Sequence, residues 1–272
     1  MNIIFFYITV IAYLFATFIS IIYLVIHNDK FIGIANKVIL AGFASHTLTI
    51  ASRWFEAGRA PFVNLHEALS LFSWMVVVIY LLIFLRHKLT VLGAFVAPFA
   101  LLLIITASFL PKEIIPLAPA LESYWLPIHV SLAFLGNAFF AMTFLFGIMY
   151  VIQERYLKSK RVGGLYFLLP SLDILDELSY RCLTYGFPLL TLAIITGAIW
   201  AEYAWGSYWS WEPRQTWSLI TWFLYAALIH GRLTVGWRGR KAAIFSIIAF
   251  LILVGSFAII KLFSWGAHAV FR

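Results

Sequence analysis

Residues 3–26 read IIFFYITVIAYLFATFISIIYLVI, a continuous apolar stretch without a charged side chain. About 20 apolar residues are enough for a helix to cross the hydrocarbon core of a bilayer. The stretch is too long for the core of a signal peptide and has no small-residue cleavage pattern, so we expect a retained first span. Of the 272 residues, 64% are hydrophobic and only 11% are charged, whereas roughly 25% charged residues are usual in a soluble domain. The sequence therefore predicts an all-α integral membrane protein.

Further apolar runs follow the first one, and together they predict about eight transmembrane helices. The expected spans are 3–26, 38–55, 68–85, 89–110, 127–152, 182–203, 216–232 and 242–264. An even number of spans places both termini on the same side of the membrane. Neither a repeat nor a flexible linker separates the runs, so we expect residues 1–272 to form a single polytopic membrane domain.

The distribution of Lys and Arg predicts the orientation. One set of alternate connections holds 13 of the 19 cations: Lys30, Lys37, Arg86, Lys88, Arg155, Lys158, Lys160, Arg161, Arg181, Arg232, Arg238, Arg240 and Lys241. The other set holds Arg53, Arg59, Lys112, Arg214 and Arg272, and Lys261 lies within the last expected span. Because cation-rich loops stay in the cytoplasm, we expect both termini and the segments 56–67, 111–126 and 203–216 on the outer face. This asymmetry explains the net charge of +8 better than binding to nucleic acid does.

Five tryptophans lie close together in the expected outer segment and the spans beside it: Trp200, Trp205, Trp209, Trp211 and Trp217. Interfacial tryptophan is common in membrane proteins, but that explanation covers one or two of them. Flat aromatic faces suit a large flat apolar ligand, and a nearby arginine suits carboxylates on that ligand. Haem has both features. The segment 203–217, with Glu212 and Arg214, is therefore a candidate haem-binding segment.

The histidines are candidates for iron ligation, because haem iron takes neutral imidazole on its axial positions. His129 and His268 are expected at the outer edge, in the plane of the tryptophan-rich segment. His46 and His230 fall within expected spans, where an unpaired histidine is costly. From the residues alone, a histidine that is hydrogen-bonded within the protein explains each position as well. The one cysteine, Cys182, excludes a CxxC motif within this chain.

Residues 205–232, WGSYWSWEPRQTWSLITWFLYAALIHGR, closely resemble the tryptophan-rich signature of the CcsA/ResC family of system II cytochrome c biogenesis proteins. The resemblance extends to GRAPFVNLHEALSLFSW (58–74), LPIHVSLAFLGNAFF (126–140), HGRLTVGWRGRKAA (230–243) and LFSWGAH (262–268), and so covers nearly the whole chain. The family usually has Asp and Glu where this chain has Glu212 and Gln215.

The resemblance implies a set of site residues. His129 and His268 would be the external pair that holds haem iron beside Trp205, Trp209, Trp211 and Trp217. His230 would be a transmembrane ligand, with His46 or a histidine of a partner as the second one. From their chemistry, Arg53, Arg59 and Arg214 are candidate partners for the haem propionates, with a salt bridge to Glu212 or Glu202 as the alternative for Arg214. Capping of the third span explains Asn64 and Glu67.

The function implied is transport of haem b (iron protoporphyrin IX) across the membrane and its presentation for thioether attachment to an apocytochrome c with a CxxCH motif. The chain would act with a CcsB/ResB-like membrane subunit as a component of a cytochrome c synthase, or haem lyase. Its membrane would be the bacterial plasma membrane or a thylakoid. Two alternatives are a HemX-like regulator of tetrapyrrole synthesis and a small-molecule permease, although the internally repeated halves of many permeases are not evident here.

Overall fold

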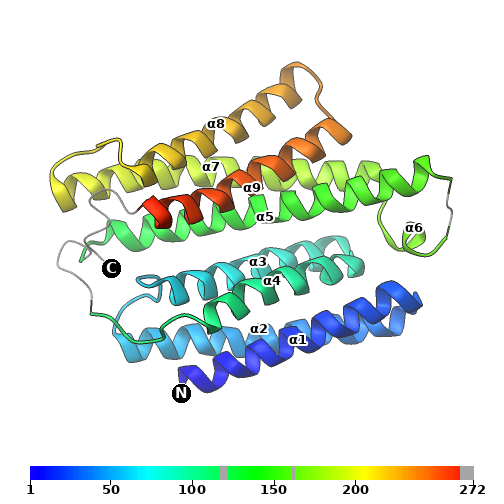
Figure 1. The fold of residues 1–272 in the computed structure, drawn as a ribbon, viewed down its shortest axis with the longest axis horizontal. Coiled ribbons are helices and arrows are strands. Elements are labelled where there is room, and N and C mark those ends of the chain that lie inside the picture. The colour runs from blue at the N-terminus through cyan, green and yellow to red at the C-terminus, as the bar shows by residue number, and fades with distance from the viewer. Residues whose placement is uncertain (117–121, 161–162, 264–272) are drawn as a thin grey trace. The chain divides into compact units, whose positions relative to one another are not determined.

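The computed structural model describes residues 1–116, 122–160 and 163–263, and the described residues form an all-α protein (Figure 1). The elements are α1 (Asn2–Ile26), α2 (Asp29–Ala57), α3 (Leu65–His87), η1 (Thr90–Leu92), α4 (Gly93–Ser108), α5 (Trp125–Lys158), α6 (Leu165–Leu168), α7 (Leu172–Trp205), α8 (Pro213–Thr234) and α9 (Arg240–Phe263). A long helix is present at each of the expected spans. Several helices extend beyond the apolar core of their span, most clearly α5 and α7.

Seven of these helices are long and apolar enough to cross a membrane. The predicted fold class, an all-α membrane protein, is confirmed, and the chain is a multi-pass membrane protein. Helix α8 is the exception among the long helices of the described chain, because Arg214, Gln215, Thr221 and His230 lower its hydropathy. The count of eight crossings and the outer placement of both termini stay predictions.

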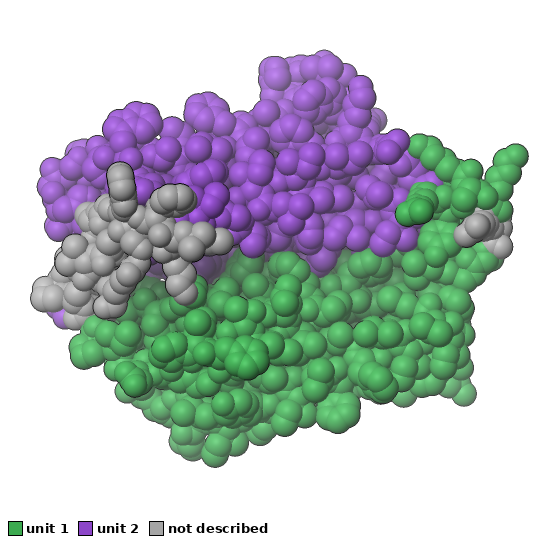
Figure 2. Space-filling model, viewed as in Figure 1, with its two compact units in different colours: residues 1–116, 155–170 green, residues 117–154, 171–272 purple. Residues whose placement is uncertain are grey.

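The helices divide into two compact units, which Figure 2 distinguishes by colour. Unit 1 comprises residues 1–116 and 155–170, and unit 2 comprises residues 117–154 and 171–272. The expectation of a single membrane domain stays a prediction, since a group of helices that pack together need not be a separate domain.

Unit 1 is built on the pair α1 and α2, with α3 and α4 packed beside it. Small residues allow close contact between the helices, as is usual in membrane bundles. At Gly42 of α2, a β-carbon would lie 2.8 Å from the ring of Tyr13 on α1. Asn28 caps the start of α2 by accepting a hydrogen bond from the backbone N–H of Lys30. Local sequence thus begins the helix, and side-chain size decides how closely it packs.

Unit 2 contains α5, α7, α8 and α9. A β-carbon at Gly136 of α5 would lie 3.1 Å from the backbone nitrogen of Leu190 on α7. A β-carbon at Gly147, farther along α5, would lie 2.9 Å from the carbonyl oxygen of Ala243 on α9. Helix α8 packs on α7 and α9, and Tyr225 of α8 stacks on Phe140 of α5 in the core. These contacts bring the start of α5, the end of α7 and the start of α8 to the same end of unit 2 (Figure 1).

The opposite end of unit 2 is held by an ion pair between α7 and α8. The guanidinium of Arg232 donates to both carboxylate oxygens of Asp176, at 2.8 and 2.5 Å. The backbone N–H of Gly239 donates to the same carboxylate at 2.9 Å, and the Arg232 guanidinium lies over the ring of Tyr180. One carboxylate therefore ties α7, the end of α8 and the turn before α9 together.

Candidate functional site

The tryptophan-rich segment forms the short loop between α7 and α8 and the helix ends that flank it. Gly206 ends α7 in a left-handed conformation, with φ of +73°, and Pro213 occupies the first turn of α8. Trp200 and Trp205 meet edge to face, with ring centroids 4.9 Å apart, and Trp209 and Trp211 do so at 5.6 Å. The loop thus holds two pairs of aromatic rings in defined orientations.

Trp211 is held out from this loop in a strained backbone conformation. Its φ is +56°, a value that is unusual for a bulky residue, and the residue is 69% exposed. Two residues of α8 stabilise the conformation. Thr216 donates its hydroxyl to the Trp211 carbonyl oxygen at 3.1 Å, and the Gln215 side chain accepts from the Ser210 backbone N–H at 2.8 Å. Strain of this kind is characteristic of functional sites.

Gln215 stands where the family usually has an acidic residue, and the structure gives it an acceptor role that a carboxylate also fulfils. We expect Gln215→Leu to release the loop, because the Ser210 N–H loses its partner. The variant should also bind the haem that the resemblance implies more weakly than the wild type does. Gln215→Glu should retain binding, since it restores a carbonyl-type oxygen at the same distance. Haem absorbance per protein after purification is the measurement. If both variants retain the same amount of haem, the Gln215 side chain does not stabilise the loop as a hydrogen-bond acceptor.

His129 lies near the start of α5, is half-buried, and contacts the C-terminal half of α7. Its Nδ1 atom is 2.7 Å from the carbonyl oxygen of Ala193. A carbonyl can only accept, so Nδ1 carries the proton and the lone pair of the neutral ring is on Nε2. The imidazole is nearly parallel to the indole of Trp200, with centroids 6.3 Å apart. The structure therefore brings His129 and the tryptophan-rich segment together.

The charged residues of the segment differ in their use. Glu212 is the N-cap residue of α8 and is buried. Arg214 is exposed and forms no hydrogen bond or ion pair with any residue that the structure describes. Trp217 follows within the first turns of α8. The charge of Glu212 acts on the Arg214 guanidinium. Because that guanidinium is also exposed, it can meet the carboxylate of an external ligand.

His46 is fully buried in unit 1 between three helices. Its Nδ1 lies 3.3 Å from the hydroxyl of Tyr13 on α1, and its Nε2 lies 3.0 Å from the hydroxyl of Ser70 on α3. Both ring nitrogens are engaged within the protein, which matches the hydrogen-bonded alternative for a buried histidine. The prediction that His46 binds iron stays untested, and this geometry does not favour it.

The remaining histidines lie in different settings. His230 is exposed near the end of α8. His268 lies outside the described residues. His66 is buried, which the amino-acid sequence did not indicate. Its Nδ1 donates to the Ala107 carbonyl oxygen at 2.8 Å, and its ring contacts Phe6.

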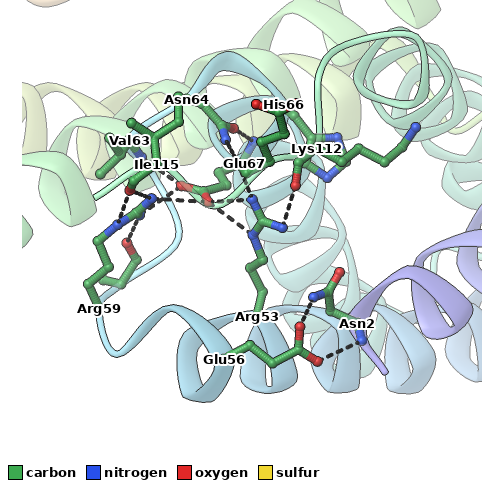
Figure 3. Close-up of polar contacts among 12 residues, drawn as sticks. Asn2, Arg53, Glu56, Arg59, Val63, Asn64, His66, Glu67, Lys112 and Ile115 are labelled. Carbon is green, nitrogen blue, oxygen red and sulfur yellow. Dashed lines mark hydrogen bonds and ion pairs between the residues drawn. The ribbon is translucent and has the colours of Figure 1, made fainter. Parts of the chain in front are cut away.

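Two of the three candidate cations for propionates are used inside unit 1. Figure 3 shows Arg53 and Arg59 converging on Glu67, whose side chain is 1% exposed. Arg53 also donates to the carbonyl oxygens of Lys112 and Glu113, and Arg59 donates to that of Ile115. Since both guanidinium groups are engaged by the protein, they brace the segment after α4. The expected capping of α3 is confirmed, because Asn64 accepts from the Glu67 N–H at 2.8 Å.

The sequence did not reveal several residues that shape these sites. A backbone carbonyl, such as that of Ala193, leaves no mark in a sequence. Gly197 of α7 lies against the His129 ring. The sequence did carry a signal for this contact, since an isolated glycine within an apolar helix often marks the close approach of another group. The pairing of Asp176 with Arg232 was not predicted from the sequence either.

Comparison with known proteins agrees with these observations. The family model described as cytochrome C assembly protein matches residues 62–268. The cytochrome c biogenesis protein CcsA of Guillardia theta is 33% identical, over 97% of this chain and 93% of that protein. CcsA of a Synechococcus strain is 34% identical, over 90% of this chain and 88% of that protein.

A solved structure has a similar fold. The cytochrome c haem lyase CcmF aligns with a TM-score of 0.69 at 14% sequence identity. The alignment covers 94% of this chain, which spans 46% of the length of the CcmF chain. The likeness concerns the fold alone.

The fold and the site define a multi-pass membrane protein with a histidine-containing aromatic site at one end of a helical bundle. The chain belongs to the CcsA/ResC family of cytochrome c biogenesis proteins.

Proposed function

We propose that this chain carries haem b across the membrane and presents it at an outer site formed by His129, His268 and the tryptophan-rich loop. There the CxxCH motif of an apocytochrome c would receive it through thioether bonds. The observation that carries the proposal is the hydrogen bond from His129 Nδ1 to Ala193, beside Trp200. It selects the tautomer with a lone pair on Nε2, which is the form that binds iron.

The described residues fit such a ligand in three respects. The aromatic pairs supply flat faces of fixed orientation. Arg214 supplies an exposed guanidinium for a propionate. The chain offers no CxxC motif of its own, so both sulfur atoms of the thioether bonds come from the apocytochrome. The role of the chain in a haem lyase is then to bind and orient the two reactants.

The exposed face of α8 is evidence for a partner subunit. Its exposed side chains follow helical spacing at Ile220, Phe223, Ala227, His230 and Leu233. A histidine on a lipid-facing stripe is costly unless it has a partner. A CcsB/ResB-like subunit that covers this face would place a second ligand near His230 and complete a system II synthase. The membrane would be a bacterial plasma membrane or a thylakoid.

The test is a haem spectrum of the purified protein, alone and with the partner subunit. We expect His129→Gly together with His268→Gly to abolish the low-spin spectrum of the outer site, because both axial nitrogens are removed. Added imidazole should restore it.

The matched control is His27→Gly. His27 has a left-handed backbone with φ of 60°, so glycine fits its position without strain, and the spectrum should not change. An unchanged spectrum in the His129, His268 double variant would refute the outer site.

A further inference from the structure

Gly197 on α7 is the residue against which the His129 ring lies. A β-carbon at position 197 would be 2.7 Å from both Nδ1 and Cε1 of His129. Real β-carbons do not approach other atoms so closely, and the opposing atoms belong to a rigid ring. The ring can therefore hold this position only while residue 197 is glycine.

The position of Gly197 in the helix explains why this matters. Ala193 lies four residues earlier on α7, so its carbonyl oxygen points along the helix toward residue 197. A side chain at residue 197 would fill the space through which the imidazole reaches that oxygen. With glycine there, His129 Nδ1 reaches the Ala193 oxygen at 2.7 Å.

We infer that Gly197 and the Ala193 carbonyl form a positioning device that sets the tautomer and the ring orientation of His129. The device acts on the iron ligand of the proposed site, and in that sense the inference rests on the proposed function. A hydrogen bond to the outer nitrogen of a ligating histidine fixes the ring and raises its basicity. Loss of such a partner typically weakens metal binding 10- to 100-fold. Trp200, whose indole is nearly parallel to the imidazole, follows Gly197 by three residues on α7. Ala193, Gly197 and Trp200 therefore all contact the His129 ring from one helix.

The first experiment needs no haem. Nitrogen NMR of haem-free protein labelled with 15N-histidine separates protonated from unprotonated imidazole nitrogens, and subtraction of the His129→Gly spectrum assigns the signals of His129. We expect a proton on Nδ1 in the wild type and a mixture of tautomers in Gly197→Ala. A wild-type ring protonated on Nε2 alone would overturn the inference, whatever the variant does.

The second experiment measures haem affinity. Gly197→Ala should bind haem at least about 10-fold more weakly than the wild type. Its control is Gly255→Ala on α9 of the same unit. Apart from its own chain neighbours and the adjacent helix backbone, no atom of the described residues lies within 4 Å of the added methyl group there. The control should keep wild-type affinity and full helical content. Unchanged affinity and tautomer in Gly197→Ala would also overturn the inference.

The two proposals fail in distinguishable ways. If His129→Gly leaves haem binding intact while Gly197→Ala still changes the tautomer, the ligand assignment fails and the positioning device stands. If His129→Gly abolishes binding while Gly197→Ala changes neither the tautomer nor the affinity, the device fails and the ligand stands.

Discussion

Glu67→Ala is expected to lower the free energy of unfolding by about 3–5 kcal/mol, the usual cost of breaking a buried ion pair. The substitution leaves Arg53 and Arg59 without their shared carboxylate, and these side chains are only 6% and 10% exposed. It also removes the acceptor of the Val63 backbone N–H. Two unpaired cations at the same place should release the segment after α4. The measurement is thermal unfolding of the purified protein in detergent.

The matched control is Glu177→Ala. Glu177 also pairs with an arginine, Arg181, but their side chains are 53% and 45% exposed. A surface pair of this kind contributes roughly 0.3–0.5 kcal/mol. Glu67→Gln, which keeps the shape and loses the charge, should fall between the two. If Glu67→Ala is no more destabilising than Glu177→Ala, the ion pairs of Arg53 and Arg59 with Glu67 (Figure 3) do not stabilise unit 1.

Asp176→Ala is expected to lower the free energy of unfolding by about 1.5–3 kcal/mol, because its partner Arg232 is nearly buried and would lose both side-chain hydrogen bonds of the pair. The side chains of the two residues are 17% and 8% exposed. The Gly239 N–H would lose its acceptor as well, so the turn between α8 and α9 should open. Trypsin should therefore cleave the folded protein faster after Arg238 and Arg240. The thermal stability of the variant should also be lower than that of the wild type.

Asp173→Ala, in the first turn of the same helix, is the control. Asp173 is exposed, and its loss removes only a favourable charge at a helix N-terminus, worth roughly 0.3–1 kcal/mol. Cleavage at the same rate in both variants would show that the Asp176 carboxylate does not hold the turn.

Helix α8 combines the family signature with a predicted membrane span. Its sequence carried the family signature and predicted a span, and a helix is present at Pro213–Thr234. The polar residues that make the signature specific also make α8 the least apolar of the long helices described. Polar residues of the signature lower the hydropathy of α8, whereas membrane crossing favours a high hydropathy. The hydropathy of α8 alone therefore does not decide whether it crosses the membrane.

The type of residue alone did not predict which arginines pair within the protein. Arg53, Arg59 and Arg214 were all predicted as outer cations that could pair with propionates, and Arg214 was the best candidate because it lies inside the tryptophan-rich motif. In the structure, the first two are buried against Glu67 and backbone carbonyls, whereas Arg214 is exposed. A guanidinium pairs with whatever acceptors the fold brings near it, and no local pattern records those acceptors.

The sequence by itself determined the membrane class, the positions of the long helices and the tryptophan-rich loop. These follow from local properties: apolar length, helix caps such as Asn64 and the helix breakers Gly206 and Pro213. Only the tertiary structure decided that both nitrogens of His46 bond to Tyr13 and Ser70, and that His129 reaches a carbonyl across Gly197. Such contacts join residues that are 24 to 64 positions apart. They depend on how closely two helices pack, which is set by side-chain volume on both partners at once.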